Sequence, residues 1–405
     1  MQEPVERIQD RLFHDTQISK ELLELRGQVR RFAVEEIAPV SAAIEAGVEE
    51  EANFPKALFE RMAELGYFRL PFTAEEGGGG YSNPMLATAI AMEELGYYSN
   101  TVAVIYDCQC VLAGRVLQYA TPELKMPYLS ALMSGEKIAC VGITEPDAGS
   151  DVSPSSVTTM AKATDAGWIV TGRKRFIINA PIADFGCVLC NMDGSLGMLV
   201  IDFKQNGVSA TPPDRKLGMH GCLTSDIVFD GVTVPRSNLV WKEGKGLRIA
   251  LGALTRGRIA VAASAVGMAQ AAFDESVDYM KRRQMFGKTI AGMQYWQFKM
   301  AERATQIGMA RDLTYKAAMR HDGGAEFPEP ETGMAKYYAT QIAADMARDA
   351  VQIFGGYGFM SKLGADGSTY RVEQIYRDAK GPEIYEGTNE IQKLMIARQI
   401  FGKGA

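Results

Sequence analysis

The chain has 405 residues, of which 47% are hydrophobic and 23% charged, so it can bury a large core spread over two or three domains. Its formal net charge of −6 argues against a nucleic-acid-binding protein, which normally carries a basic surplus. No run of about 18 apolar residues predicts a membrane-spanning helix, and the first residues lack the apolar core of a secretion signal. We expect a soluble, cytoplasmic protein.

Cysteine spacing gives no sign of a metal centre. Cys187 and Cys190 have C-x-x-C spacing, but they lie in an apolar run typical of a strand, where residues three apart face opposite sides. No second Cys or His pair with ligand spacing accompanies them. We therefore expect buried, reduced thiols and no metal site.

Residues 1–135 predict an N-terminal helical domain. The segment 21–40 has apolar residues at helical intervals, and a further helix follows Pro55 and ends at Gly66. Two more helical patterns cover 84–95 and 122–133. The glycine-rich stretch between the second and third of these helices lacks a preceding strand, so it does not predict a dinucleotide-binding loop.

Residues 136–243 are dense in Val, Ile, Thr and Gly, in short runs separated by turn residues. We predict strands over five of these runs, namely 157–161, 168–171, 185–190, 198–201 and 226–229. No long helical pattern separates them, which favours a central antiparallel β-barrel or sandwich over a βαβ array.

The helical period returns in residues 244–405, which predict a C-terminal helical bundle. Four long segments joined by short loops carry it: 247–283, 293–319, 332–354 and 389–401. The fold class expected for the whole chain is therefore multidomain α+β, with the β domain between two helical ones.

Glu386 is the principal candidate for a catalytic group. It lies in the loop Tyr385-Glu386-Gly387-Thr388, just before a helix for which Asn389 and Gln392 form a predicted capping box. Apolar neighbours would remove water from the carboxylate and raise its pKa toward the range of a general base. Gly387 would let a ligand approach the backbone closely. Local chemistry alone leaves open whether Glu386 is a base or an ordinary loop glutamate.

With Arg377-Asp378-Ala379-Lys380 before it, this loop resembles the C-terminal signature of the acyl-CoA dehydrogenase family. Further segments match that family in order along almost the whole chain: 143–151, 174–179, 283–288 and 352–358. The resemblance implies an FAD enzyme that converts an acyl-CoA to the trans-2-enoyl-CoA in fatty acid metabolism. Glu386 would take the α-proton, flavin N5 would accept the β-hydride, and an electron-transferring flavoprotein would receive the electrons.

The resemblance also assigns binding residues. Those expected to contact FAD are Ile143, Thr144, Ser150, Phe176, Ile178, Arg283, Phe286, Gln294, Gln352, Gly355, Gly356, Thr388 and Glu390. Among these, the group from Arg283 to Gly356 is expected to reach the FAD of a neighbouring subunit, in a homodimer or homotetramer. Ser150, Thr255, Arg258 and Gly387 are expected to line the substrate path.

Three positions depart from the family pattern. Ile178 replaces a usual threonine whose hydroxyl points at flavin N5, and Thr255 replaces an aspartate that faces the pantetheine in several members. Gly257 occupies the place of the alternative base of isovaleryl-type enzymes, so the resemblance assigns the base to Glu386. Thr255 and the run 179–184 leave open a substrate tethered to a carrier protein. A flavin oxidase or monooxygenase on the same fold also stays open, as does a helical scaffold without flavin.

Overall fold

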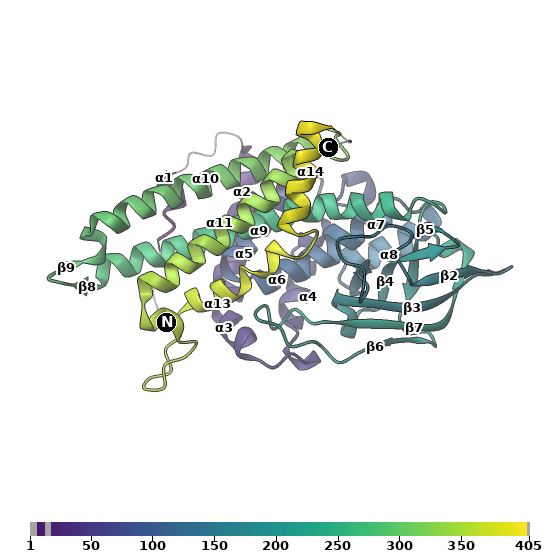
Figure 1. Ribbon diagram of the computed structural model, residues 1–405, viewed down its shortest axis with the longest axis horizontal. Helices are drawn as coiled ribbons and strands as arrows, with labels where there is room; N and C mark the ends of the chain where they lie inside the picture. Colours follow the sequence, from purple (N-terminus) through teal and green to yellow (C-terminus); the bar gives the residue numbers. More distant parts are fainter. Residues whose placement is uncertain (1–5, 13–17, 403–405) are drawn as a thin grey trace.

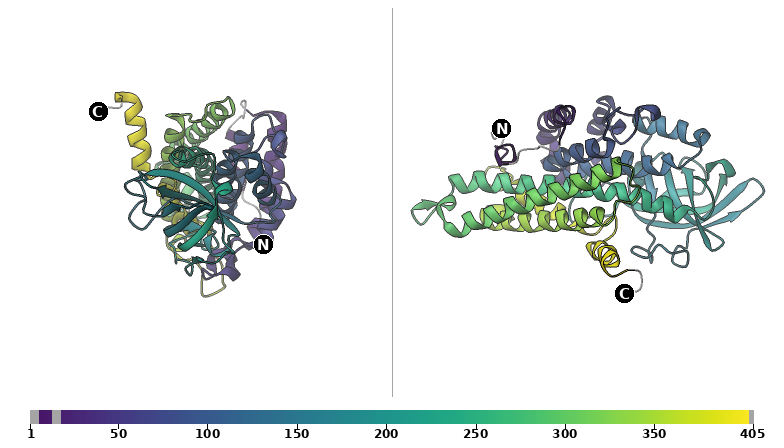
Figure 2. Two further views of the ribbon diagram at one scale, coloured as in Figure 1. Left: turned by 90° about the vertical axis from the view of Figure 1, so that its right-hand side faces the viewer. Right: turned by 90° about the horizontal axis from the view of Figure 1, so that it is seen from above.

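The computed structural model describes residues 6–12 and 18–402 and shows an elongated helical body with a β-sheet domain at one end (Figures 1 and 2). The first part of the chain is helical, as expected. Its elements are α1 (Gln9–Leu12), α2 (Lys20–Phe32), a π-helical turn (Ala33–Ile37), α3 (Ala38–Ala46), α4 (Lys56–Glu64), α5 (Pro84–Tyr98), α6 (Asn100–Tyr106), a second π-helical turn (Asp107–Leu112), α7 (Ala113–Gln118) and α8 (Pro122–Met133).

Seven strands form one curled sheet in the middle of the chain: β1 (Ala139–Gly142), β2 (Met160–Ala163), β3 (Gly167–Ile178), β4 (Phe185–Met192), β5 (Ser195–Asp202), β6 (Val208–Ala210) and β7 (Thr224–Pro235). The spatial order is β1-β4-β2-β3-β7-β6, with β5 paired to β4. The long pairs are antiparallel, with β3 against β7 and β4 against β5. β1 and β2 pair with β4 in parallel, which sequence periodicity does not reveal.

The strand predicted over 157–161 begins later than expected, at Met160. The reason is a buried carboxylate. The backbone N–H groups of Thr158 and Thr159 donate to Glu145 at 2.7 and 3.0 Å, so these two groups are not available to a neighbouring strand. Glu145 also accepts a hydrogen bond from the buried Lys174 on β3 at 2.7 Å.

The C-terminal part consists of α9 (Gly246–Arg282), α10 (Gln294–Asp322), α11 (Glu331–Phe354), the short α12 (Gly356–Phe359) and α13 (Arg371–Asp378), and α14 (Asn389–Phe401). A hairpin of β8 (Gln284–Met285) and β9 (Lys288–Thr289) joins α9 to α10. The helical body groups α9, α10 and α11 with α5 from the first domain. α14 lies against α11 at the outside of this body (Figure 2) and exposes Leu394, Ile400 and Phe401.

α9 is the central helix of the body. It is long and apolar enough to cross a membrane by composition, yet 83% of its most apolar window is buried inside the protein. Its neighbours are α5, α10 and α11, so its apolar surface faces other helices. The carboxyl-terminal half of α5 contributes polar groups to the same interior, where Glu93 and Glu94 are fully buried.

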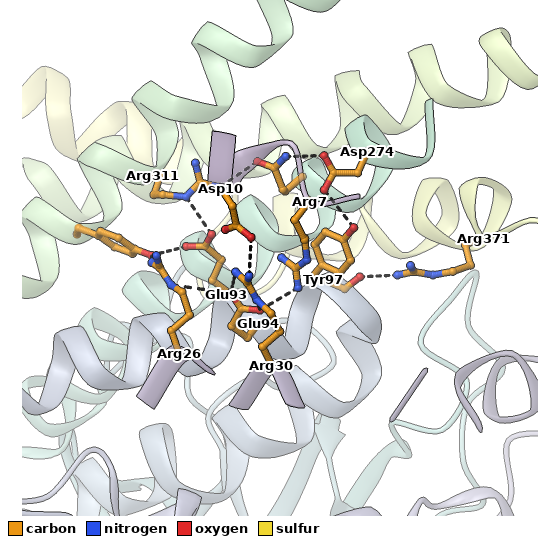
Figure 3. A network of polar contacts seen from close by, with 12 residues as sticks. Arg7, Asp10, Arg26, Arg30, Glu93, Glu94, Tyr97, Asp274, Arg311 and Arg371 are labelled. Atoms are coloured by element: carbon orange, nitrogen blue, oxygen red, sulfur yellow. Dashed lines mark hydrogen bonds and ion pairs between the residues drawn. The ribbon is translucent and has the colours of Figure 1, made fainter. Parts of the chain in front are cut away.

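A buried polar network joins α2, α5 and α10 (Figure 3). Glu93 accepts hydrogen bonds from Arg311 at 2.9 Å and from Tyr315 at 2.5 Å. Glu94 accepts two from Arg30, at 3.0 and 3.1 Å. Buried carboxylates are tolerated when they are paired and hydrogen-bonded in this way, so the network fixes the first domain on the helical body.

The six cysteines are buried free thiols, as expected, and Cys187 and Cys190 both lie in β4. Within residues 6–12 and 18–402, no group of three or more His, Cys, Asp or Glu side chains is arranged to hold a metal ion.

Candidate functional site

Glu386 lies at a bend of the backbone between α13 and α14. Its φ is +56°, in the left-handed region that costs a non-glycine residue on the order of 1–3 kcal/mol. Three side-chain donors hold the bend. Arg258 Nε donates to the carbonyl of Glu386 at 3.0 Å, and Lys336 Nζ and Gln392 Nε2 donate to the carbonyl of Gly387 at 2.9 Å each. The strained conformation is therefore fixed by α9, α11 and α14 together.

The predicted capping box at the start of α14 is wrong by one residue. The N-cap is Thr388, whose Oγ1 accepts from the backbone N–H of Ile391 at 3.4 Å. Asn389 instead accepts hydrogen bonds from Lys336 and Thr340 of α11, at 3.1 Å each. The Asn389 side chain, which the local sequence pattern assigns to the helix cap, is thus bound by residues of α11 instead.

The carboxylate of Glu386 points into the protein. A Cβ added at Gly257 would lie 2.0 Å from Glu386 Oε2 and 2.6 Å from Leu112, so these residues form one wall of its pocket. Glu386 Oε2 is buried. The expected rise in the pKa of Glu386 is confirmed: burial raises it, while a hydrogen bond with Asp107 and the charges of Arg258 and Lys336 oppose the rise. Ile384 contributes less shielding than predicted, because its side chain is 56% exposed.

Two of the expected substrate-path residues lie on α9 close to this loop. Arg258 is buried, and its Nη1 lies 3.7 Å from Oε1 of Glu329. Burial lowers the pKa of Arg258, and the carboxylates of Glu329 and Glu386 counteract that effect. Thr255 is also buried, and its hydroxyl donates to the carbonyl of Leu251 one turn earlier at 2.8 Å. The structure thus brings Arg258 and Gly387 together, whereas Thr255 bonds within its own helix.

A cavity of about 400 Å³ lies between the sheet domain and the loop that leads to Glu386. Phe176 and Ile178 of β3 line one side, and Arg377, Ile384 and Tyr385 line the other. Phe176 is 57% exposed and has a φ of +58°. A planar ring with apolar faces and a polar edge, such as the isoalloxazine of FAD, fits this cavity because aromatic and aliphatic side chains alternate there with charged ones.

Other expected cofactor residues lie beside β3. The backbone N–H of Arg175 donates to the carbonyl of Thr144 at 2.8 Å, and Lys174 Nζ donates to the carbonyl of Ile143 at 3.2 Å. These bonds place the loop after β1 next to Phe176. Ser150 lies farther along that loop, exposed and outside the lining of the cavity.

A second cavity, of about 540 Å³, is formed where α9 and α11 end, away from the sheet domain (Figure 1). Arg283, Gln352, Gly355 and Gly356 line it, while Phe286 is 91% exposed on the hairpin and Gln294 is exposed at the start of α10. Arg258 lies on α9, and Arg283 directly follows the last residue of that helix 25 residues later, which corresponds to about 37 Å along the helix. Of the expected FAD residues, Phe176 and Ile178 thus line the first cavity, whereas Arg283, Gln352, Gly355 and Gly356 line the second.

Sequence reasoning missed two titratable residues next to Glu386. Asp107, from the second π-helical turn, lies next to the Glu386 carboxyl group. Lys336, from α11, binds the loop as described above. The sequence contains a weak signal for Asp107, which is the single acidic residue in the apolar stretch 101–118. An acidic side chain in a stretch that is expected to be buried is a candidate for a functional role.

Comparison with known protein families gives matches over nearly the whole chain. Residues 19–136 match the family domain described as "Acyl-CoA dehydrogenase, N-terminal domain", residues 140–232 its middle domain and residues 244–401 its C-terminal domain. A 3-(aryl)acrylate reductase of Clostridium sporogenes is 39% identical over 93% of this chain and 97% of its own length. A short-chain-specific acyl-CoA dehydrogenase of Clostridium acetobutylicum is 36% identical over 96% of this chain and 100% of its own.

Solved structures show the same fold. Butyryl-CoA dehydrogenase from Megasphaera elsdenii superposes with a TM-score of 0.88 at 33% identity, covering 96% of this chain and 100% of that one. This likeness confirms the expected three-part fold. A glutaryl-CoA dehydrogenase from Mycobacterium smegmatis, described in complex with FADH2, matches with a TM-score of 0.87 at 25% identity over 96% of this chain and 97% of that one. It confirms a flavin cofactor among relatives of this chain.

Two further matches concern partners. The caffeyl-CoA reductase-Etf complex subunit CarC of Acetobacterium woodii is 35% identical over 94% of this chain and 98% of its own. The prolyl acyl carrier protein oxidase AnaB matches in structure with a TM-score of 0.84 at 25% identity, over 95% of this chain and 100% of that one. Proteins of this architecture thus include a component of an electron-transferring flavoprotein complex and an enzyme named for a carrier-bound substrate.

Proposed function

This chain belongs to the acyl-CoA dehydrogenase family of FAD-dependent oxidoreductases acting on CH–CH groups, and from that premise we propose that it desaturates an acyl-CoA at the α and β carbons. The observation that carries the proposal is the buried carboxylate of Glu386, fixed by α9 and α11 beside a cavity that fits a flavin ring. When bound, FAD accepts the hydride from the β carbon.

Glu386 is the base that takes the α-proton. Burial raises its pKa above the ordinary glutamate value, which strengthens it as a base. Arg258 and Lys336 keep part of the carboxylate population charged, and only the charged form can accept a proton. Gly257 and Leu112 close the space behind the carboxylate and exclude water from it.

The thioester oxygen gains negative charge as the α-proton leaves, and it needs a donor. Among the described residues, the backbone N–H of Glu386 has no acceptor, so it is available for this oxygen. A preorganised donor at the position of developing charge is the usual origin of such stabilisation.

We also propose that the electrons pass to an electron-transferring flavoprotein, as the name of the CarC relative suggests. Ile143, Thr144, Ser150, Phe176, Ile178, Thr388 and Glu390 would hold the flavin of their own chain, whereas Arg283, Phe286, Gln294, Gln352, Gly355 and Gly356 would hold that of a neighbour in a homodimer or homotetramer. Two separate cavities in one chain support this division. A cytoplasmic location completes the proposal.

A second candidate is the reverse reaction on an aryl-substituted enoyl thioester. It is favoured by the names of two relatives at 39% and 35% identity, an arylacrylate reductase and a caffeyl-CoA reductase subunit. The same residues serve, because a protonated Glu386 would return the proton to the α carbon. The direction then depends on the electron donor.

The test is anaerobic titration of the FAD-loaded protein with acyl-CoA thioesters of several chain lengths, including 3-arylpropionyl-CoA. We expect at least one to bleach the visible flavin band. Glu386→Gln should keep FAD and lose bleaching by a factor of roughly 10³ or more, because the amide is no base. A control, Glu302→Gln on the exposed surface of α10, should leave the bleaching rate unchanged within about twofold.

Four outcomes would change the proposal. Full bleaching of Glu386→Gln would remove that residue from the mechanism. If only thioesters of a carrier protein bleach the flavin, the substrate is tethered to a carrier protein in place of CoA. Rapid reoxidation of the bleached enzyme by air would indicate an oxidase. If the 3-aryl-2-enoyl-CoA reoxidises the reduced enzyme faster than any saturated thioester reduces it, the reductive candidate prevails.

A further inference from the structure

Asp107 is a buried acidic residue that the proposed mechanism does not use. It opens the π-helical turn Asp107–Leu112 between α6 and α7, and its side chain is only 3% exposed. Such wide turns inside helices recur at functional sites because they displace one residue from the regular ladder. Here the turn brings the carboxyl group of Asp107 next to that of Glu386, which lies far away in the sequence.

A hydrogen bond between two carboxyl groups requires one proton, because a carboxylate can only accept. Asp107 Oδ1 and Glu386 Oε2 are both buried, and neither has a hydrogen-bond partner among the described residues. Two ionised carboxylates in contact within a dry pocket repel each other strongly. The pair therefore holds one proton at neutral pH, and the surrounding charges decide which residue has it.

The charges around the pair are arranged on one side. Glu386 faces two cations, Arg258 of α9 and Lys336 of α11. Asp107 faces no Lys or Arg among the described residues; besides Glu386, its titratable neighbours are Tyr106, Cys108, Cys110 and Tyr385. Burial raises the pKa of each of these four groups well above its ordinary value, so all are neutral at pH 7. The cations thus favour the charge on Glu386.

We propose that Asp107 keeps its proton at neutral pH and donates it in a hydrogen bond to the carboxylate of Glu386, as a positioning residue for the base. The inference rests on the proposed function only where it names Glu386 the base. The location of the proton is a property of the resting protein. Burial and the Glu386 charge both raise the pKa of Asp107, which agrees with this assignment.

The bond has a consequence for the reaction. A donor to the carboxylate stabilises its charged form, so Asp107 keeps Glu386 ionised at a lower pH than burial alone would allow. Without that donor, the pKa of Glu386 would be higher, and a smaller fraction of the protein would have the ionised carboxylate near neutral pH. The acidic limb of the reaction's pH profile therefore depends on Asp107, although Asp107 releases no proton to the substrate.

Two variants separate the donor from the charge. Asp107→Asn keeps an N–H donor to Glu386 and cannot titrate, whereas Asp107→Leu has the same approximate size and no donor. The first readout is the infrared C=O band of a protonated, buried carboxyl group in the FAD-loaded protein at pH 7. We expect Asp107→Asn to lose one such band relative to wild type. Asp151→Asn, at an exposed carboxylate, should lose none.

The second readout is the pH dependence of anaerobic flavin bleaching by the best thioester. Asp107→Leu should move the acidic limb up by about one pH unit or more, and Asp107→Asn should leave it near that of wild type. Identical infrared spectra of wild type and Asp107→Asn would overturn the inference, as would a wild-type acidic limb in Asp107→Leu. If Asp107→Leu does not fold, the infrared comparison decides. Failure of every thioester to bleach wild type would reject the proposed function and leave the infrared result valid.

Discussion

Glu386 has room for its carboxylate only because residue 257 is glycine. Gly257 of α9 lies against the Glu386 side chain, and a Cβ there would lie 2.0 Å from Oε2. Glycine inside a helix costs about 0.5–1 kcal/mol relative to alanine. This position accepts that cost because the buried carboxylate needs the space.

The variant Gly257→Ala tests the contact between residue 257 and Glu386. The new methyl group should push the Glu386 carboxylate away from Asp107 and the flavin cavity, and bleaching by acyl thioesters should slow at least about tenfold, because small misplacements of a reacting group are costly. FAD should remain bound. Gly27→Ala in α2 is a control, since its nearest neighbour would be 3.9 Å away. Wild-type bleaching by Gly257→Ala would contradict the contact between the two residues.

Among the elements, α11 determines the geometry of the Glu386 loop. Lys336 donates to the carbonyl of Gly387 and to Asn389, and Thr340, one turn later, donates to the same Asn389 oxygen. Burial lowers the pKa of Lys336 to about 8, while the charge of Glu386 opposes that shift. The lysine is held charged at neutral pH by the loop that it positions.

This pKa predicts how stability varies with pH. The pKa of Lys336 is about 8 in the folded protein and 10.5 as its ordinary value. Between these values the unfolded chain binds more protons than the folded one, so raising the pH through this window stabilises the fold, by on the order of 2–3 kcal/mol. In urea unfolding experiments, Lys336→Met should lack this rise in the free energy of unfolding with pH. Lys393→Met, at an exposed position of α14, should keep it. An equal gain in wild type and Lys336→Met would show that Lys336 is not the group responsible.

The molecule as a whole is elongated (Figures 1 and 2), and its two candidate cofactor cavities are lined by different parts of the chain. Phe286 projects from the hairpin, and α14 exposes Leu394, Ile400 and Phe401. Large apolar side chains exposed together often mark a contact between subunits. The arrangement supports the proposal that a neighbouring copy completes each FAD site.

Mixing two inactive variants tests this arrangement. Glu386→Gln impairs the base, and Arg283→Glu places a negative charge in the second cavity, so each alone should be inactive. If each site combines Glu386 of one copy with Arg283 of another, co-expressed variants should recover about a quarter of wild-type activity in a dimer, because half of the mixed dimer's sites are intact. Mixing the separately purified variants without exchange is the control. No recovery in verified mixed oligomers would place both residues in one site.

Local signals in the sequence predicted much of the fold. Gly66 has the left-handed conformation expected after α4, and the proline after Thr121 begins α8 as expected. The change to β-branched residues after position 136 marks the sheet, and the long helices of the last domain lie close to their predicted bounds. The reaction class was predicted by resemblance, because the motif around Glu386 is contiguous in the chain.

The sequence by itself determined where helices and strands form and which carboxylate to suspect, because those features depend on neighbours within a few residues. Tertiary structure alone decided that α5 joins the helical body, that Asn389 bonds α11 in place of capping its own helix, and that Asp107 meets Glu386. Each of these depends on contacts between residues far apart in the chain. Periodicity and capping rules carry no information about such pairs, since their energies come from burial and charge in the folded interior.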